Sequence, residues 1–136
     1  MKKVLSIFTA ALAMFALLAF AGCAPKGQVT EGENIVVIEA SAKDDGKTLL
    51  AVMEGLQEAG ELTFTVSDGM VTSINGTSQT TSSYWMLYTS DAENANEQWG
   101  TFEYEGETLG SAIYGAGELT VKEGCVYLWA FESFGL

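Results

Sequence analysis

Residues 48–58 read Thr-Leu-Leu-Ala-Val-Met-Glu-Gly-Leu-Gln-Glu, and this stretch has the clearest periodicity of the chain. Its apolar residues recur every three or four positions, which places them on one face of a helix: Leu49, Val52, Met53 and Leu56. Thr48 is a favourable N-cap before this run, and Gly60 is a suitable stop after it. We predict a helix over residues 49–58, the one convincing helix of the sequence after Cys23.

The segments around this helix have the composition of β-strands. Residues 35–40 are rich in β-branched side chains, and apolar runs at 62–66, 70–74, 84–88 and 99–104 are separated by turn signals such as Asn75-Gly76. Residues 119–121 and 125–131 are expected to form a closing hairpin. One helix beside about six strands predicts an α+β fold, with the helix packed on a single mixed β-sheet in a β-grasp-like arrangement.

The N-terminal residues have a different character from this domain. Lys2 and Lys3 precede an apolar run over residues 4–20, and the small residues Ala21 and Gly22 stand directly before Cys23. This order resembles a bacterial lipoprotein signal, which implies removal of residues 1–22 and lipidation of Cys23. The protein would then be exported and lipid-anchored at the outer face of the bacterial cell membrane. The alternatives are a plain signal peptide with a bystander cysteine, or an uncleaved membrane helix.

The polar stretch that follows predicts a flexible tether over residues 23–34, and residues 35–136 then form one domain. The formal net charge of −12 disfavours nucleic acid and anionic lipid headgroups as partners. The chain has no histidine, which removes histidine-based catalysis and histidine metal sites. With Cys23 lipidated, Cys125 has no cysteine partner, and we expect it to be a buried structural thiol.

Several blocks of this sequence are similar to a known family. They are residues 48–53 at the start of the helix, residues 69–76, the aromatic run Tyr84-Trp85-Met86-Leu87-Tyr88, and residues 119–124 followed by a strand with Trp129. Together they resemble the DUF4430 domain, which is similar to the C-terminal β-domain of transcobalamin and intrinsic factor. In the eukaryotic proteins this domain closes over cobalamin held against a helical barrel. The resemblance therefore implies a β-domain that would present half of a corrinoid site.

Large aromatic side chains are the candidate ligand-binding groups, because they offer flat stacking surfaces for a ring, a sugar or a protein hot spot. The candidates are Trp85, Tyr88, Trp99, Tyr104 and Tyr114. The alternative for each is a place in the core of a small domain. Alternation along the strand separates Trp85 and Leu87 from Tyr84, Met86 and Tyr88. Since the helix covers one face only, a second layer must cover the other face, or some aromatic surface stays exposed.

These observations leave two classes of function open. The first is a membrane-anchored binding module for a small-molecule ligand, which the resemblance suggests is a corrinoid. The second is a cell-surface module that contacts a protein or a glycan without a small-molecule ligand. We expect no enzymatic activity, no catalytic residues, no metal site and no bound cofactor, because histidine, arginine and a nucleophile motif are missing from the sequence. A pocket lined by Trp85, Tyr88, Trp99 or Tyr114 would favour the first class, and a flat aromatic patch the second.

Overall fold

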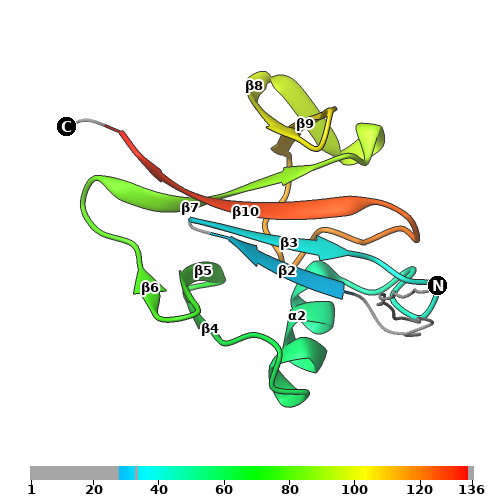
Figure 1. Cartoon of the computed structure of the whole chain (residues 1–136), viewed down its shortest axis with the longest axis horizontal. Coiled ribbons are helices and arrows are strands. Elements are labelled where there is room, and N and C mark those ends of the chain that lie inside the picture. Colours follow the sequence, from blue (N-terminus) through cyan, green and yellow to red (C-terminus); the bar gives the residue numbers. More distant parts are fainter. Residues whose placement is uncertain (1–27, 33, 135–136) are drawn as a thin grey trace, which may run out of the picture.

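The computed structural model describes residues 28–32 and 34–134 (Figure 1). The predicted signal peptide at residues 1–22 and the predicted lipidation at Cys23 lie outside the described residues. Within residues 28–32 and 34–134, no helix is long and apolar enough to cross a membrane.

A six-stranded sheet forms the larger part of the fold, with the strand order β2-β3-β10-β7-β9-β8. Its strands are β2 (Gln28–Gly32), β3 (Ile35–Glu39), β7 (Ser83–Thr89), β8 (Ala95–Tyr104), β9 (Glu107–Ala112) and β10 (Val126–Ser133). A smaller three-stranded sheet contains β4 (Phe64–Ser67), β5 (Met70–Ile74) and β6 (Thr77–Ser78). The helix α2 (Leu49–Glu58) lies between β3 and β4 in the sequence.

The α+β class is confirmed, whereas the prediction of one mixed sheet is wrong. The described strands form two sheets, and all their pairings are antiparallel. Tight turns are one reason, because two-residue turns at Asp68-Gly69, Asn75-Gly76 and Glu105-Gly106 reverse the chain into hairpins. All six of these residues have positive φ, which suits such turns.

The predicted tether is shorter than expected. Residues 28–32 form β2, which pairs with β3 from Gln28 opposite Glu39 to Gly32 opposite Ile35. The sequence of this segment is polar, and a polar composition does not prevent pairing at the edge of a sheet. The domain therefore begins by Gln28 in the structure and not at Ile35.

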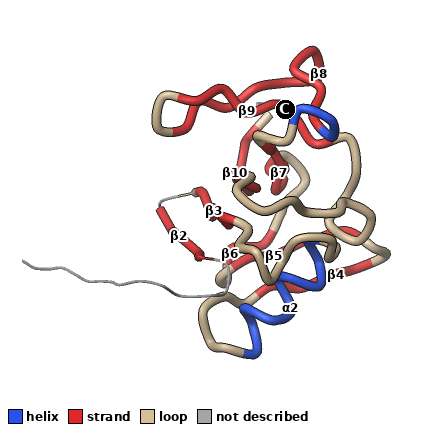
Figure 2. The backbone as a smooth tube through the Cα atoms, turned by 90° about the vertical axis from the view of Figure 1, so that its right-hand side faces the viewer, coloured by secondary structure: helices blue, strands red, loops and turns tan. Residues whose placement is uncertain are grey.

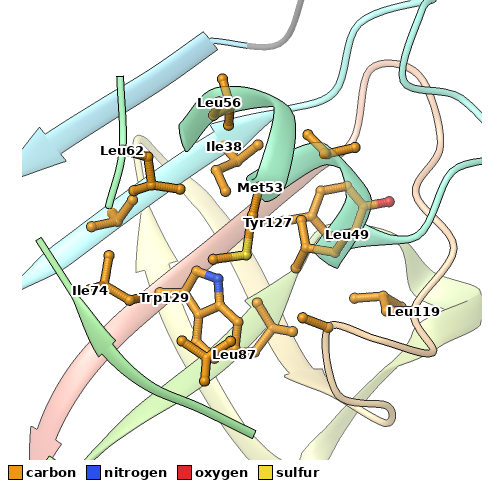
Figure 3. Close-up of a cluster of buried hydrophobic side chains, with 14 of the residues drawn as sticks. Ile38, Leu49, Met53, Leu56, Leu62, Ile74, Leu87, Leu119, Tyr127 and Trp129 are labelled. Carbon is orange, nitrogen blue, oxygen red and sulfur yellow. The ribbon is translucent and has the colours of Figure 1, made fainter. Parts of the chain in front are cut away.

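The helix begins and ends where its sequence predicts. The Thr48 side chain accepts a hydrogen bond from the Ala51 backbone N–H at 3.1 Å, and Gly60 has the positive φ of a C-terminal stop. All four residues of its apolar face are buried. They pack with Ile38 from β3, and with Leu87, Tyr127 and Trp129 from the neighbouring strands (Figure 3). The helix therefore covers one face of the large sheet.

The predicted closing hairpin is wrong, because residues 119–121 do not pair with β10. The backbone N–H of Leu49 donates to the Leu119 carbonyl at 2.8 Å, and the Val121 N–H donates to the Lys47 carbonyl at 2.8 Å. Leu119 and Val121 are buried in the cluster beneath the helix. These residues therefore hold the start of α2 through backbone hydrogen bonds and burial, and they do not add a strand to the sheet.

A second apolar cluster lies on the opposite face of the large sheet. It contains Tyr88 from β7, Leu109 from β9 and Leu128 from β10, with Phe102 and Tyr104 of β8 packed against it. The β8–β9 hairpin folds over this face, so that the molecule has three layers (Figure 2). The hairpin is therefore the second layer that we expected over the face of β7 that α2 does not cover.

We predict that Gly110→Ala destabilises the β8–β9 hairpin by about 1–3 kcal/mol. A Cβ atom at Gly110 would lie 3.0 Å from Ala95 Cβ and 3.1 Å from Glu97 Cγ, closer than packed carbons approach. Gly55→Ala in α2 is the control, because its Cβ would meet no atom within 4 Å and alanine favours a helix. Urea unfolding of both variants is the measurement, and equal stability of Gly110→Ala and wild type would contradict this packing.

Candidate functional site

An apolar cavity of about 190 Å³ opens between the small sheet and β7, which carries the aromatic run of the sequence. Its walls come from the turn before β5, from β7 and β10, and from the end of β9 with the loop behind it. The lining residues are Gly69, Met70, Val71, Trp85, Met86, Leu87, Ser111, Ala112, Gly115, Ala116 and Trp129. A second cavity of about 170 Å³ beside α2 contains Lys43, Asp44 and Lys47 and has no aromatic wall. The first cavity is therefore the candidate ligand site, and we call it the β7–β10 cavity.

Two tryptophans give the β7–β10 cavity its rigid walls. The Trp85 indole Nε1 donates a hydrogen bond to the Thr77 carbonyl at 2.8 Å, and its ring lies 5.1 Å from the Phe131 ring. Trp129 is 5% exposed, and its Nε1 is buried with no hydrogen-bond partner among the described residues. In Figure 3 this nitrogen lies on the side of the ring that faces Met53. The cavity is thus bordered by fixed aromatic surfaces.

Met70 gives the cavity a partly open rim. It is 60% exposed although it lines the cavity, and it follows Gly69 in the turn between β4 and β5. Thioether side chains are flexible and adapt to ligands of different shape. Ser111, which is buried, adds a hydroxyl group to an otherwise apolar lining. The site can therefore hold an apolar group and offer it one polar side-chain contact.

Tyr88 lies on the other face of the sheet and does not reach the cavity. Its hydroxyl donates to the Glu132 carboxylate at 3.0 Å, and its ring lies 5.6 Å from the Phe102 ring. Burial and the Glu132 carboxylate raise the pKa of Tyr88 to about 12. Tyr104 packs against the same cluster, and its pKa is also raised, by burial and then by Glu105 and Glu39. The structure thus brings these two candidates together in the second apolar cluster, where they pack the β8–β9 hairpin against the sheet and form no ligand site.

Trp99 and Tyr114 are surface residues, 64% and 48% exposed. Trp99 lies on β8, and Tyr114 lies next to Gly115 of the cavity wall without lining the cavity itself. The five predicted residues therefore occupy four separate places, and Trp85 is the one that lines the cavity. Sequence analysis missed Met70 and Ala112 as wall residues, since a small or flexible apolar side chain carries no signal of its own.

The acidic loop before β8 is occupied by interactions within the protein. Lys122 Nζ lies 3.3 Å from Asp91 Oδ1 and also contacts Glu93, and the Asn94 side chain donates to Asp91 at 2.8 Å. The hydrogen bond that Lys122 donates to the Glu93 carboxylate raises the pKa of Lys122, as does the interaction with Asp91. Within the part of the chain that the structure describes, no group of three or more acidic, histidine or cysteine side chains is arranged to hold a metal ion.

Cys125 is a free thiol and is partly buried against the cluster beneath the helix.

No protein-family model, no curated protein and no solved structure matches this chain.

Proposed function

We propose that this protein is a membrane-anchored, extracytoplasmic ligand-binding module whose site is the β7–β10 cavity. The observation that carries the proposal is an apolar cavity with two tryptophan walls, Trp85 and Trp129, and a flexible rim residue, Met70. Concave apolar sites with a few polar groups are the usual form of small-molecule sites. The anchor is the lipid expected on Cys23, which supports a role outside the cytoplasmic membrane.

The size of the cavity limits the ligand. Ligand sites commonly enclose roughly 300–1,000 Å³, and the volume here is about 190 Å³. A flat apolar ring or an apolar substituent fits such a space, whereas a macrocycle does not. A corrinoid would therefore insert one edge between Met70 and Trp85 and keep its ring outside, and no histidine could bind its cobalt.

The domain type belongs to the same proposal. We infer a DUF4430-like domain with a β-grasp-like arrangement of the kind seen in the transcobalamin C-terminal domain. The similar sequence blocks support it, and so does a single helix packed across one face of a sheet. Enzymatic activity is not expected.

The test is a calorimetric titration of the full-length chain in mild detergent with indole and with cyanocobalamin. We expect saturable heat with indole at micromolar to millimolar affinity, as small rings in small cavities give. Ala112→Leu should abolish this heat, because the larger side chain fills the cavity from its wall. Tyr114→Ala is the matched control, since it removes a nearby aromatic ring that does not line the cavity.

Saturable binding of cyanocobalamin that is lost in Ala112→Leu would support the corrinoid assignment. Binding of indole alone would keep the cavity as the site and reject a corrinoid ligand. Absence of heat with both probes at millimolar concentration would overturn the proposal.

The second candidate function is a cell-surface module that contacts a protein or a glycan. The exposure of Trp99 and Tyr114 favours it, because exposed aromatic side chains are frequent hot spots of interfaces. It needs no cavity, so binding of a partner by the Ala112→Leu variant would distinguish it from the first.

A further inference from the structure

The strand β8 forms one edge of the large sheet. It stands last in the strand order, and within residues 28–32 and 34–134 its one strand partner is β9. The edge of a sheet exposes backbone N–H and C=O groups that can pair with another extended chain. Natural proteins commonly protect such edges with lysine, proline or a bulge. β8 contains neither lysine nor proline, and after its irregularity at residues 97–100, residues 101–104 pair regularly with β9.

The register of the hairpin identifies the free backbone groups. The two-residue turn at Glu105-Gly106 makes Tyr104 and Glu107 the hydrogen-bonded pair that closes the hairpin. Alternation then makes Glu103 and Thr108 a non-hydrogen-bonded pair, and the 2.6 Å hydrogen bond between their side chains fits the closer approach of such pairs. The N–H and C=O of Glu103 therefore point away from β9.

Trp99 lies in an irregular part of this edge strand. Asn96 pairs with Ser111 and Thr101 with Gly110, so that residues 97–100 bulge out of the ladder. Gly100 has a φ of 148° in this bulge, and a Cβ there would lie 3.7 Å from the Tyr88 ring. The bulge therefore passes beside the Tyr88 ring at ordinary packing distance, and Trp99 next to Gly100 is largely exposed to solvent.

The charge of the hairpin has a single sign. Its acidic residues are all exposed: Glu97, Glu103, Glu105 and Glu107. The sequence from 95 to 112 contains no lysine or arginine. An exposed indole and exposed carboxylates on one hairpin suit a cationic segment, which can bind the face of the ring and is attracted by the charges.

We propose that the β8 edge binds an extended cationic peptide segment of a partner protein, which adds a strand next to β8. Backbone hydrogen bonds to Glu103 supply the pairing, as in other cases of strand addition. Lysine or arginine side chains on alternate positions of the peptide then contact Trp99 and the glutamates. This surface lies apart from the β7–β10 cavity, since none of residues 95–108 lines that cavity.

Charge also decides against a second copy of the chain at this edge. Two β8 edges in contact would bring eight carboxylates together, and like charges at close range oppose association. A sugar could stack on Trp99, but it would use neither the free backbone groups nor the charge. The cationic peptide is the one occupant that uses all three features.

The test is fluorescence anisotropy of a labelled eight-residue peptide that alternates lysine with threonine or valine, titrated with the full-length chain in mild detergent. We expect micromolar binding that weakens with added salt. Trp99→Ala should weaken it by about tenfold or more, as loss of a hot spot does. Glu103→Pro removes the free N–H at an edge position that tolerates proline, and Glu103→Gln is its matched control for charge alone. We expect Glu103→Pro to weaken binding more strongly than Glu103→Gln.

Two further peptides complete the experiment. The lysine peptide with N-methylated backbone keeps its charge but cannot form the strand pairing, and the counterpart with glutamate in place of lysine reverses the charge. Weak binding of both would support the proposal. Equal binding of the N-methylated and parent peptides, or no binding of the parent peptide, would overturn it.

The other occupants are tested on the same samples. A dimer seen by light scattering, and dissociated by Glu103→Pro, would show that the β8 edge binds a second copy of the chain and would overturn the proposal. Quenching of tryptophan fluorescence by cellohexaose that disappears in Trp99→Ala, without binding of the lysine peptide, would show that the edge binds a glycan and overturn the proposal. Binding that is lost in Ala112→Leu but retained in Trp99→Ala would assign the peptide to the cavity and overturn the proposal.

Discussion

Replacing Trp129 by alanine is expected to lower the free energy of unfolding by about 3–5 kcal/mol, the cost typical of truncating a buried aromatic residue. Trp129 is 5% exposed and lies between α2 and the large sheet, where it belongs to the same cluster as Met53 and Leu87 (Figure 3). Its indole Nε1 has no hydrogen-bond partner among the described residues, so the cost comes from lost packing and not from a lost hydrogen bond.

The measurement is urea unfolding of the full-length chain followed by circular dichroism. Trp99→Ala is the matched control, because the same residue type is 64% exposed there and should change stability by less than about 0.5 kcal/mol. A loss for Trp129→Ala as small as that for Trp99→Ala would contradict the position of Trp129 in the core. Since small domains are stable by about 5–15 kcal/mol, the variant should keep a measurable transition.

Raising the pH from 10 to 12 is expected to remove about 4 kcal/mol of stability through Tyr88 and Tyr127. Burial, with Glu132 as a further cause, raises the pKa of Tyr88 from 10.0 to about 12, and burial raises that of Tyr127 to about 12 as well. The unfolded chain therefore loses these phenol protons first. The stabilisation is complete below pH 10 and is lost as the pH rises through the folded-state pKa values near 12.

Unfolding at pH 9, 10, 11 and 12 measures this dependence, together with phenolate absorbance of the folded protein. Tyr88→Phe should remove about half of the decrease, because phenylalanine cannot ionise. Tyr127→Phe should do the same, although it also costs about 1 kcal/mol at neutral pH through loss of the hydrogen bond that its oxygen accepts from the Lys122 N–H at 2.9 Å. A phenolate titration of all tyrosines complete by pH 11 would be incompatible with these buried positions.

The elements with local signals were predictable from the sequence. The helix at Leu49–Glu58 has the expected boundaries because Thr48 and Gly60 act through neighbouring backbone groups. The strands β3 and β5 also have expected positions, since β-branched runs and Asn75-Gly76 set them locally. The separation of Trp85 from Tyr88 onto two faces follows from alternation alone, and the structure places them in different clusters.

The arrangement of these elements depended on contacts between distant residues. Residues 119–121 have a strand pattern, yet Leu119 and Val121 bond to the start of α2, 70 or more residues earlier in the sequence. Residues 28–32 have a tether composition and nevertheless pair with β3. The candidate site could not be predicted for the same reason. Trp85, Trp129 and Met70 line one cavity only because β10 and the β4–β5 hairpin lie beside β7.

The α+β class, the position of the α-helix, the two faces of the aromatic strand and the acidic charge could all be predicted from the sequence. These features depend on residue type and on spacing within a few positions of the chain. By contrast, three features depend on how distant segments pack together: the two antiparallel sheets, the place of Trp129 in the cavity wall, and the exposure of Trp99 on an edge strand. Burial is a property of assembled layers, because a tryptophan becomes a core residue only when another element packs over it and otherwise stays at the surface.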